Sequence, residues 1–498
     1  MKKYFFFTVL SIFLFSTTYA KHQYEEYSFN AFWKYEIKGS DNYHQFKSDL
    51  IQDKGVIKEI KNGYSEYTAA KPDWSKCSGD KTASFDYIPL FCYGNDGKLL
   101  SKNERKIIDK EWKKDKHYKA ISYKDGKHEL PEHARPNDAT ISLYEERKKR
   151  FIDKRRQGRL YIIEPKGNAK NFNFEKNLAS SKLEKQLSKG FLLSYLFYDN
   201  GIIKYDGKAK DGRFKKDITN ETLFFTHSTG KSITSYIVGH AICDGYISSI
   251  DEIIDWPLME NTLYHGQPLR NLLNMAAGDK HVVDKNTTRF IGSSTHHRSM
   301  GLDTIALLLQ GTKAKGNKVF YNNALSDIIA NYIIFKAGDK YDELMKKVFQ
   351  DKIKIENEIA YGKHKKFRQY IASYTYYMTR LDFLRFAEAM MRDYQNKTCV
   401  GNYLRESQQQ AKKWFKYRPS KKNAHWYLHN YSKKYGSQFY FDFHGMKKRN
   451  VIGTEGKNGQ NILIDLDNSR IVVTNSAATG WNVRTFMLNV IRKGKLPK

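Results

Sequence analysis

The last two-thirds of the chain begin with a pattern of apolar and polar residues that is typical of a β-hairpin. Residues 191–198 are a run of apolar strand formers, and residues 202–205 form a second short run. Asp199-Asn200-Gly201 between them has the composition of a tight turn. We therefore expect a β-hairpin here that opens a new domain at about residue 181.

A helical pattern follows this hairpin. After Ser228, apolar residues recur every three to four positions as far as Cys243, and Asp244-Gly245 resembles a C-terminal cap. Further helical patterns are found at residues 302–309, 324–335, 341–349 and 380–391.

The C-terminal part returns to strands. Residues 461–466 and 470–475 flank a turn at 467–469, and a helix is expected over about 481–491. Strands at both ends therefore bracket a mainly helical middle. We predict an α/β (α+β) domain over 181–498, with an antiparallel sheet flanked by helices and a mainly helical subdomain.

Residues 21–180 differ in composition and are rich in Lys, Tyr and Asp. A strand is expected at 159–163 and a helix at 145–156. Because aromatic residues are plentiful, we expect a folded N-terminal accessory domain of unknown type rather than disorder.

The first twenty residues have the form of a secretory signal peptide. Lys2 and Lys3 precede an apolar run over 4–15, and small residues stand before a cleavage position after Ala20. The alternative is an uncleaved anchor, but the run is short of the roughly 20 residues that span a bilayer. We expect an exported bacterial protein, periplasmic or secreted, with no transmembrane segment after signal removal.

Export permits disulfides, and the four cysteines allow three full pairings. Cys77 with Cys92 is the economical pairing because they are close in sequence. The cysteine spacing does not resemble a zinc site, and His296-His297 is more typical of a solvated loop. We expect neither a metal nor a cofactor.

The chain is strongly basic. Without Lys2 and Lys3 it has 86 − 2 = 84 Lys and Arg against 54 Asp and Glu, a balance of +30. Such a charge attracts polyanions, which for an exported protein include anionic envelope polymers. A Lys-rich solvated surface is the simpler explanation, and export argues against a nucleic-acid enzyme.

Candidate chemistry begins with Ser228 and Lys231. This Ser-x-x-Lys spacing places both side chains on one side of a helix start, where the Lys amine can take the Ser proton. Ser78 and Lys81 have the same spacing, but no helical pattern follows them. Ser228 is therefore the preferred nucleophile, and an ordinary helix N-cap is the alternative.

Two later segments could complete such a site. Tyr321-Asn322-Asn323 stands at the entrance to a helix, where a Tyr near a Lys can relay protons. Residues 456–460 read Gly-Lys-Asn-Gly-Gln directly before a strand, where a backbone N–H and a cation can meet a substrate.

In this order, the segments resemble the serine β-lactamase and penicillin-binding-protein family. The likeness is to class C β-lactamases and related D-amino-acid peptidases, esterases and aminohexanoate-oligomer hydrolases, over roughly 185–498. Besides the three segments above it is carried by residues 239–247, 269–278 and 378–386.

The resemblance implies a β-lactamase/transpeptidase-like fold and a role for each matching residue. Ser228 matches the acylated serine, Lys231 its base partner and Tyr321 the general acid/base. The substrate-side and oxyanion positions match Asn323, Lys457, Gly459 and Gln460, with the backbone N–H groups of Ser228 and Gln460 as the oxyanion pair. Asn458 replaces the usual hydroxyl residue, which weakens the expectation of a penicillin or peptide carboxylate.

We therefore expect an exported serine hydrolase that cleaves an ester or amide through an acyl-enzyme, without a cofactor. The alternative is a catalytically inactive envelope-binding protein of the same fold, with residues 21–180 binding a polyanion. The intact Ser228, Lys231 and Tyr321 favour the enzyme.

Overall fold

The computed structural model describes residues 151–498, with gaps at 152–153, 157, 159, 210–217, 284–301, 303–304, 307–308, 310, 364–369, 372–374, 421–423 and 478–480. The expectations for the signal peptide, for Cys77 with Cys92, for Ser78 with Lys81 and for His296-His297 lie outside these residues. So does the expectation for most of the N-terminal domain.

The described residues fall into two compact units. Unit 1 comprises Asp244–Asp342 and Lys363–Ile371, and unit 2 comprises the described residues up to Cys243, Glu343–Gly362 and Ala372–Lys498.

Unit 2 is built on a nine-stranded sheet with the order β2-β4-β3-β14-β13-β12-β11-β10-β9. Its neighbouring strands are antiparallel except β2 and β4. The strands are β2 Asn173–Phe174, β3 Leu192–Asp199, β4 Ile202–Lys208, β9 Lys412–Lys413, β10 Ser432–Gly436, β11 Phe439–Phe443, β12 Val451–Gly456, β13 Gln460–Asp465 and β14 Arg470–Ser476. Both predicted hairpins are confirmed, as β3–β4 and β13–β14.

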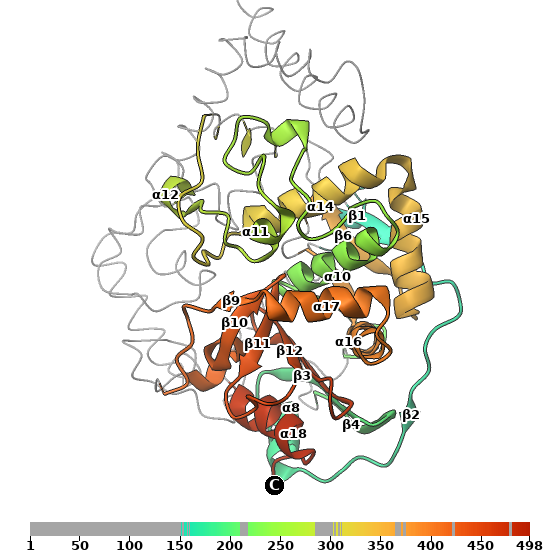
Figure 1. Cartoon of the computed structure of the whole chain (residues 1–498). Coiled ribbons are helices and arrows are strands. Elements are labelled where there is room, and N and C mark those ends of the chain that lie inside the picture. Colours follow the sequence, from blue (N-terminus) through green and yellow to red (C-terminus); the bar gives the residue numbers. More distant parts are fainter. Residues whose placement is uncertain are drawn as a thin grey trace, which may run out of the picture. The chain divides into compact units, whose positions relative to one another are not determined.

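Helices cover both faces of this sheet, since every residue of the central strand β13 is buried. Figure 1 shows α10, α16 and α17 on one face and α8 and α18 on the other. The helices of unit 2 are α8 Ser181–Lys189, α10 Thr229–Cys243, α15 Tyr341–Lys346 (which begins in unit 1), the π-helix Lys347–Ile353, α16 Arg380–Gln395, α17 Cys399–Gln409, the π-helix Arg484–Leu488 and α18 Asn489–Lys493. The predicted fold class, an antiparallel sheet flanked by helices, is confirmed.

A second sheet in unit 2 has the strand order β1-β6-β8-β5. These strands are β1 Leu160–Ile163, β6 Ile359–Lys363, β8 Tyr377–Thr379 and β5 Leu223–Phe225. β1 confirms the strand expected at 159–163, and it pairs with β6 over its whole length. β1 and β2 thus add strands to the sheets of unit 2, although both precede residue 181.

Unit 1 is mainly helical, as the pattern in the middle of the chain predicts. Its regular elements are η3 Pro257–Met259, α11 Leu269–Leu273, α12 Lys280–Val283, α14 Asn323–Ala337, η4 Gly338–Lys340 and the short strand β7 Tyr370–Ile371. α14 is its long central helix, and 13 of its 15 residues are buried.

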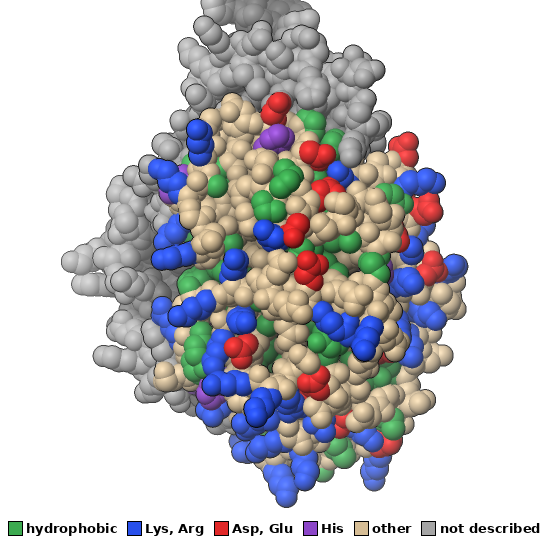
Figure 2. Space-filling view, in the orientation of Figure 1, with side chains coloured by type: hydrophobic (Ala, Val, Ile, Leu, Met, Phe, Trp, Pro, Cys, Tyr) green, Lys and Arg blue, Asp and Glu red, His purple; other side chains and the backbone are tan. Residues whose placement is uncertain are grey.

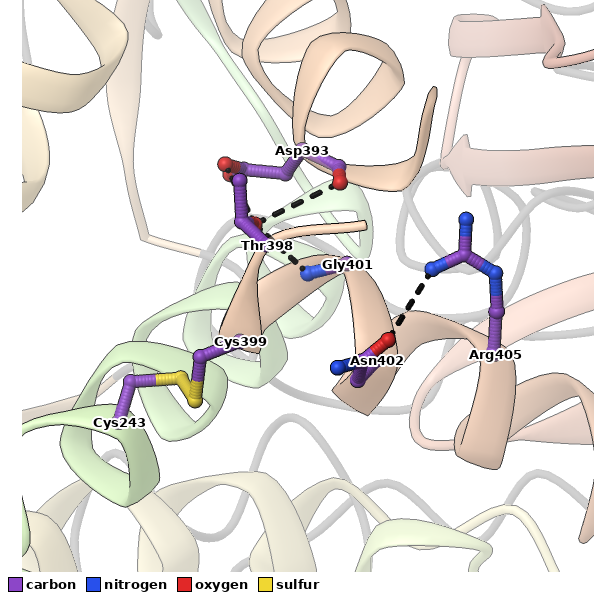
Figure 3. The surroundings of a disulfide bond; sticks show 7 residues. All are labelled: Cys243, Asp393, Thr398, Cys399, Gly401, Asn402 and Arg405. Atoms are coloured by element: carbon purple, nitrogen blue, oxygen red, sulfur yellow. Dashed lines mark hydrogen bonds between the residues drawn. A yellow bond between two sulfur atoms is a disulfide. The ribbon is translucent and has the colours of Figure 1, made fainter. Parts of the chain in front are cut away.

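A disulfide joins Cys243, the last residue of α10, to Cys399, the first residue of α17. On the α17 side of the disulfide, Thr398 caps the helix, and its hydroxyl accepts from the Gly401 N–H at 3.1 Å (Figure 3). The same hydroxyl donates to the Asp393 carboxylate at 2.9 Å. The end of α10 is therefore fixed covalently to a well-capped helix start.

Candidate active site

Ser228 lies in a tight turn between strand β5 and helix α10. The turn is made by His227, whose φ of +49° is unusual for a residue with a side chain. The Gly230 N–H donates to the His227 carbonyl at 2.9 Å, and the Lys231 N–H donates to the Ser228 carbonyl at 3.1 Å. Ser228 is half-buried and stands where the free N–H groups of a helix start are found.

The Lys231 amine lies within hydrogen-bond distance of the Ser228 hydroxyl. Its Nζ donates to Ser228 Oγ at 3.1 Å, and the Lys231 side chain is only 1% exposed. The i, i+3 spacing thus brings a buried amine to a partly exposed hydroxyl. The geometry is that of a nucleophile with a neighbouring base.

Helix α10 is held rigidly behind this pair. Thirteen of its fifteen residues are buried, and it contacts α17, β12 and β13. The Ser232 hydroxyl donates to the Gln438 carbonyl at 2.7 Å, and Ser235 and Tyr403 share a hydrogen bond at 2.6 Å. A side chain at Gly239 would collide with the Tyr403 ring. These contacts fix the position of α10, and with it the position of Lys231.

The Gly-Lys-Asn-Gly-Gln segment forms the turn between β12 and β13, and it lies against the nucleophile loop. A Cβ built on Gly456 would lie 2.2 Å from the Thr226 carbonyl oxygen, so only glycine permits this approach. Thr229 donates through Oγ1 to the Gln460 carbonyl at 2.7 Å. These contacts place residues 456–460 next to the segment that carries Ser228.

The turn itself depends on Asn458 and Gly459. Their φ angles are +68° and +82°, and Asn and Gly are the residues that tolerate this region best. A Cβ on Gly459 would also lie 2.8 Å from the indole nitrogen of the buried Trp481. Trp481 therefore backs the turn.

The side chain of Gln460 forms its hydrogen bonds inside the protein. Its Nε2 donates to the Ser476 carbonyl at 2.6 Å, and its Oε1 accepts from Asn475 at 3.2 Å. Any contact of Gln460 with a substrate would therefore be made by its backbone.

Tyr321 and Asn323 belong to unit 1, where both are half-buried at the start of α14. Between them, Asn322 is fully buried and caps the helix, its side-chain oxygen accepting from the Ala324 N–H at 2.9 Å. The structure thus brings Ser228, Lys231 and residues 456–460 together in unit 2, and it places Tyr321 and Asn323 side by side in unit 1.

A buried acid supports the Tyr321 segment. The Asp279 carboxylate accepts from Asn322 Nδ2 at 2.6 Å and from the Tyr264 hydroxyl at 3.1 Å. Burial raises the pKa of Asp279 above its usual range, and burial together with Asp279 raises the pKa of Tyr264. Asp279 and Tyr264 therefore fix the backbone from which Tyr321 projects.

Sequence reasoning did not identify Thr226, Thr229, Asp279 or Tyr264 as supports of the candidate site. The one visible signal is Asp279, an acid directly after the apolar segment 269–278. An acid in such a place can be a buried hydrogen-bond acceptor.

In the described part of the chain, no helix is long and apolar enough to cross a membrane. Nor do the described residues contain a group of three or more His, Cys, Asp or Glu side chains that could hold a metal ion.

Comparison with known proteins gives little at the level of sequence. No family model matches the chain. An uncharacterised protein of Alkalihalophilus pseudofirmus is 25% identical over 159 residues, which are 31% of this chain and 46% of that protein. The match thus spans about half the length of that relative.

The structural neighbours are β-lactamase-related and penicillin-binding-protein-like hydrolases. They include a putative 6-aminohexanoate-dimer hydrolase from Bacillus anthracis, with a TM-score of 0.49, 12% identity and coverage of 68% of this chain and 92% of that chain. FmtA from Staphylococcus aureus has a TM-score of 0.44, 18% identity and coverage of 70% and 97%. The hydrolase EstCE1, with promiscuous acyltransferase activity, has a TM-score of 0.43, 14% identity and coverage of 59% and 91%. At these values the neighbours assign neither an activity nor a substrate to this chain.

Proposed function

We propose that this protein is a serine hydrolase that cleaves an ester or amide bond through an acyl-enzyme on Ser228. The observation that carries the proposal is the 3.1 Å contact between the buried Lys231 amine and the Ser228 hydroxyl at the start of α10. A helix N-cap serine alone has no need of a buried amine beside it.

In the first step, the Ser228 oxygen attacks the substrate carbonyl carbon while its proton passes to Lys231 Nζ. Burial supports this role, because an amine that has lost its hydration favours the neutral form that can accept a proton. The backbone N–H groups of Ser228 and Gln460 are the proposed donors to the oxyanion of the tetrahedral intermediate.

Collapse of this intermediate breaks the bond to the leaving group, which takes a proton relayed by Lys231 and Tyr321. Water then attacks the acyl-enzyme and gives a proton to the same groups. Collapse of this second intermediate breaks the bond between the acyl carbon and the Ser228 oxygen, which takes that proton as the acid product leaves. Each step moves one proton and one acyl group, so no cofactor is required.

For the substrate, we propose an ester or amide without a carboxylate next to the scissile bond. Asn458 stands where the resembling family has a hydroxyl residue that binds a carboxylate, and its φ of +68° is part of the turn. We also propose that the protein is exported and that its substrate is an ester or amide of the cell envelope.

The decisive experiment is intact-protein mass spectrometry after incubation with a serine-directed fluorophosphonate. We expect one covalent adduct on the wild-type protein and none on Ser228→Ala. Ser78→Ala is the matched control, because Ser78 has the same spacing to a lysine, and it should label as the wild type does. Labelling of folded Ser228→Ala at the wild-type level would overturn the proposal.

A panel of uncharged esters, amides and β-lactams would then define the reaction. Turnover of esters or amides supports the hydrolase. A stable adduct with β-lactams and no turnover of any substrate would instead favour a penicillin-binding scaffold.

A further inference from the structure

A second feature of unit 2 lies at the other end of strand β12. The loop at 444–450 precedes β12, whereas the turn at 457–459 follows it. Six residues of strand separate the two ends, a distance of about 20 Å. The loop therefore lies outside the proposed hydrolase site.

The loop borders an open cavity of about 500 Å³. Four of its seven lining residues are Lys or Arg, and none of the seven is an acid. The basic lining residues are Lys433, Lys447, Lys448 and Arg449, and the remaining three are His444, Gly445 and Met446.

The cavity belongs to a stretch of sequence with an extreme charge balance. Residues 411–450 contain eleven Lys and Arg and a single acid, Asp442. In the face shown in Figure 2, Lys and Arg side chains gather toward the lower end of the molecule, where α18 lies. Residues 411–450 therefore carry a net charge of 11 − 1 = +10, against +32 for the whole chain.

Arg449 forms the structural wall of the cavity. Its guanidinium pairs with the buried Asp465 and donates to the carbonyls of Ile491 and Arg492. Burial and the nearby Arg470 lower the pKa of Arg449. Because Asp465 neutralises Arg449, the net positive charge at the cavity comes from the lysines.

The three lysines have no such acid partner among the residues that the structure describes. Lys447 and Lys448 are exposed, and Lys433 lies over the Tyr417 ring at 5.6 Å from its centroid. Two acids lie in neighbouring segments. Asp467 accepts from Asn450, and Asp442 lies on β11, which pairs with the strand of Lys433, where it acts electrostatically on Tyr417. Three ammonium groups around one cavity, none of them in an ion pair with a described residue, repel each other, and an anion bound between them would offset this repulsion.

We propose that this cavity is a binding site for a phosphate group, held by Lys433, Lys447 and Lys448. Lysine donates to phosphate as a flexible point charge, and a concave site strengthens its field over that of a flat surface. The volume exceeds that of a single phosphate, so the phosphate would be carried on a larger molecule. The site would tether the protein to a phosphate-bearing envelope component.

Isothermal titration with inorganic pyrophosphate at about 50 mM NaCl tests the site directly. We expect saturable binding to the full-length protein and a loss of affinity of about tenfold or more in the double variant Lys447→Ala/Lys448→Ala. Lys412→Ala/Lys413→Ala is the matched control, since both lysines are exposed on β9 of the same sheet and do not line the cavity. This control should change the affinity by less than about twofold.

Two further probes identify the carrier of the phosphate. Linear polyphosphate and vesicles of phosphatidylglycerol present the same group on a polymer and on a lipid surface. One of these probes should bind more tightly than pyrophosphate, and its binding should weaken only in the Lys447→Ala/Lys448→Ala variant. That probe identifies the kind of molecule that carries the phosphate. Equal losses in both double variants, or no saturable binding of any probe, would overturn the proposal.

Discussion

Helices α10 and α14 are alike in length and burial but differ in how their N-termini are capped. Each has 15 residues, of which 13 are buried, and each follows a candidate catalytic residue. At the start of α14 the Asn322 side chain caps the helix. At the start of α10 the Ser228 hydroxyl instead accepts from Lys231 Nζ.

The two helices also differ in how they are anchored. α14 is fixed at its beginning by the buried Asp279, which holds Asn322. α10 is fixed at its end by the disulfide from Cys243. A helix whose first hydroxyl is kept for chemistry cannot use it as a cap, and its stability must then come from packing and from its other end. The predictions below test this difference, starting with the largest effect.

The first prediction concerns the amine at the start of α10. Lys231→Met keeps the length and apolar stem of the side chain but removes the proton acceptor. We expect hydrolysis to fall about 10³-fold or more, a loss typical of removing a positioned base, with little change in thermal stability. Kinetics with an activated ester and a thermal melt measure the two effects.

Lys231→Arg sharpens this test, because a guanidinium retains the charge and cannot act as a base at neutral pH. It should be as inactive as Lys231→Met. Activity of the Arg variant near the wild-type level would mean that Lys231 acts only through its charge.

The second prediction concerns the other end of α10. The disulfide closes a sequence separation of 156 residues, so its loss should markedly increase the entropy of the unfolded chain. We expect Cys243→Ser/Cys399→Ser to lose about 2–4 kcal/mol of unfolding free energy, measured with denaturant. The same double variant should retain the Lys231–Ser228 contact, and therefore fluorophosphonate labelling under native conditions.

Much of this comparison could be predicted from the sequence, because it depends on local periodicity. The hairpins β3–β4 and β13–β14 and the helices α10, α14 and α16 all have clear patterns. The Ser228–Lys231 contact follows from helical spacing alone.

The elements that were not predicted lack such a local signal. β5 and β8 have three residues each and form through pairing, β5 with β8 and β8 also with β6. β10, with the sequence Ser-Lys-Lys-Tyr-Gly, has too many lysines to resemble a central strand. Helix α17 begins at Cys399, and its disulfide partner is too distant in sequence to be inferred from spacing.

The supports of the site were missed for the same reason. Asp279, Tyr264 and Asn322 are separated by 15 to 58 positions, and their hydrogen bonds arise only when unit 1 is folded. Single-sequence periodicity contains no information on such contacts.

The third prediction concerns the cap of α14. Asn322→Ala removes the cap and also leaves the buried Asp279 carboxylate without one donor. We expect a loss of about 3 kcal/mol of unfolding free energy, from about 1 for the cap and about 2 for the carboxylate. Asn322→Ser restores a cap but not the donor, so it should recover only the smaller part. Full recovery of stability in Asn322→Ser would show that Asp279 does not depend on Asn322.

The last prediction concerns a buried histidine near the end of α10. Burial lowers the pKa of His240 to about 4, partly opposed by Asp393, while an unfolded histidine titrates near 6.5. Between these values the unfolded state binds the extra proton, so stability must fall as the pH falls. The loss should reach about 2 kcal/mol between pH 7 and pH 5.

His240→Phe keeps an aromatic ring against Tyr236, whose ring centroid lies 4.7 Å away, and removes the titrating group. Its unfolding free energy should therefore decline less steeply with acid than that of the wild type, by the same amount of about 2 kcal/mol. His265→Asn, at an exposed histidine of unit 1, should leave the pH profile unchanged. If His240→Phe and the wild type show parallel profiles, the acid sensitivity of this protein arises outside α10, and the buried imidazole is not the titrating group that distinguishes this helix from α14.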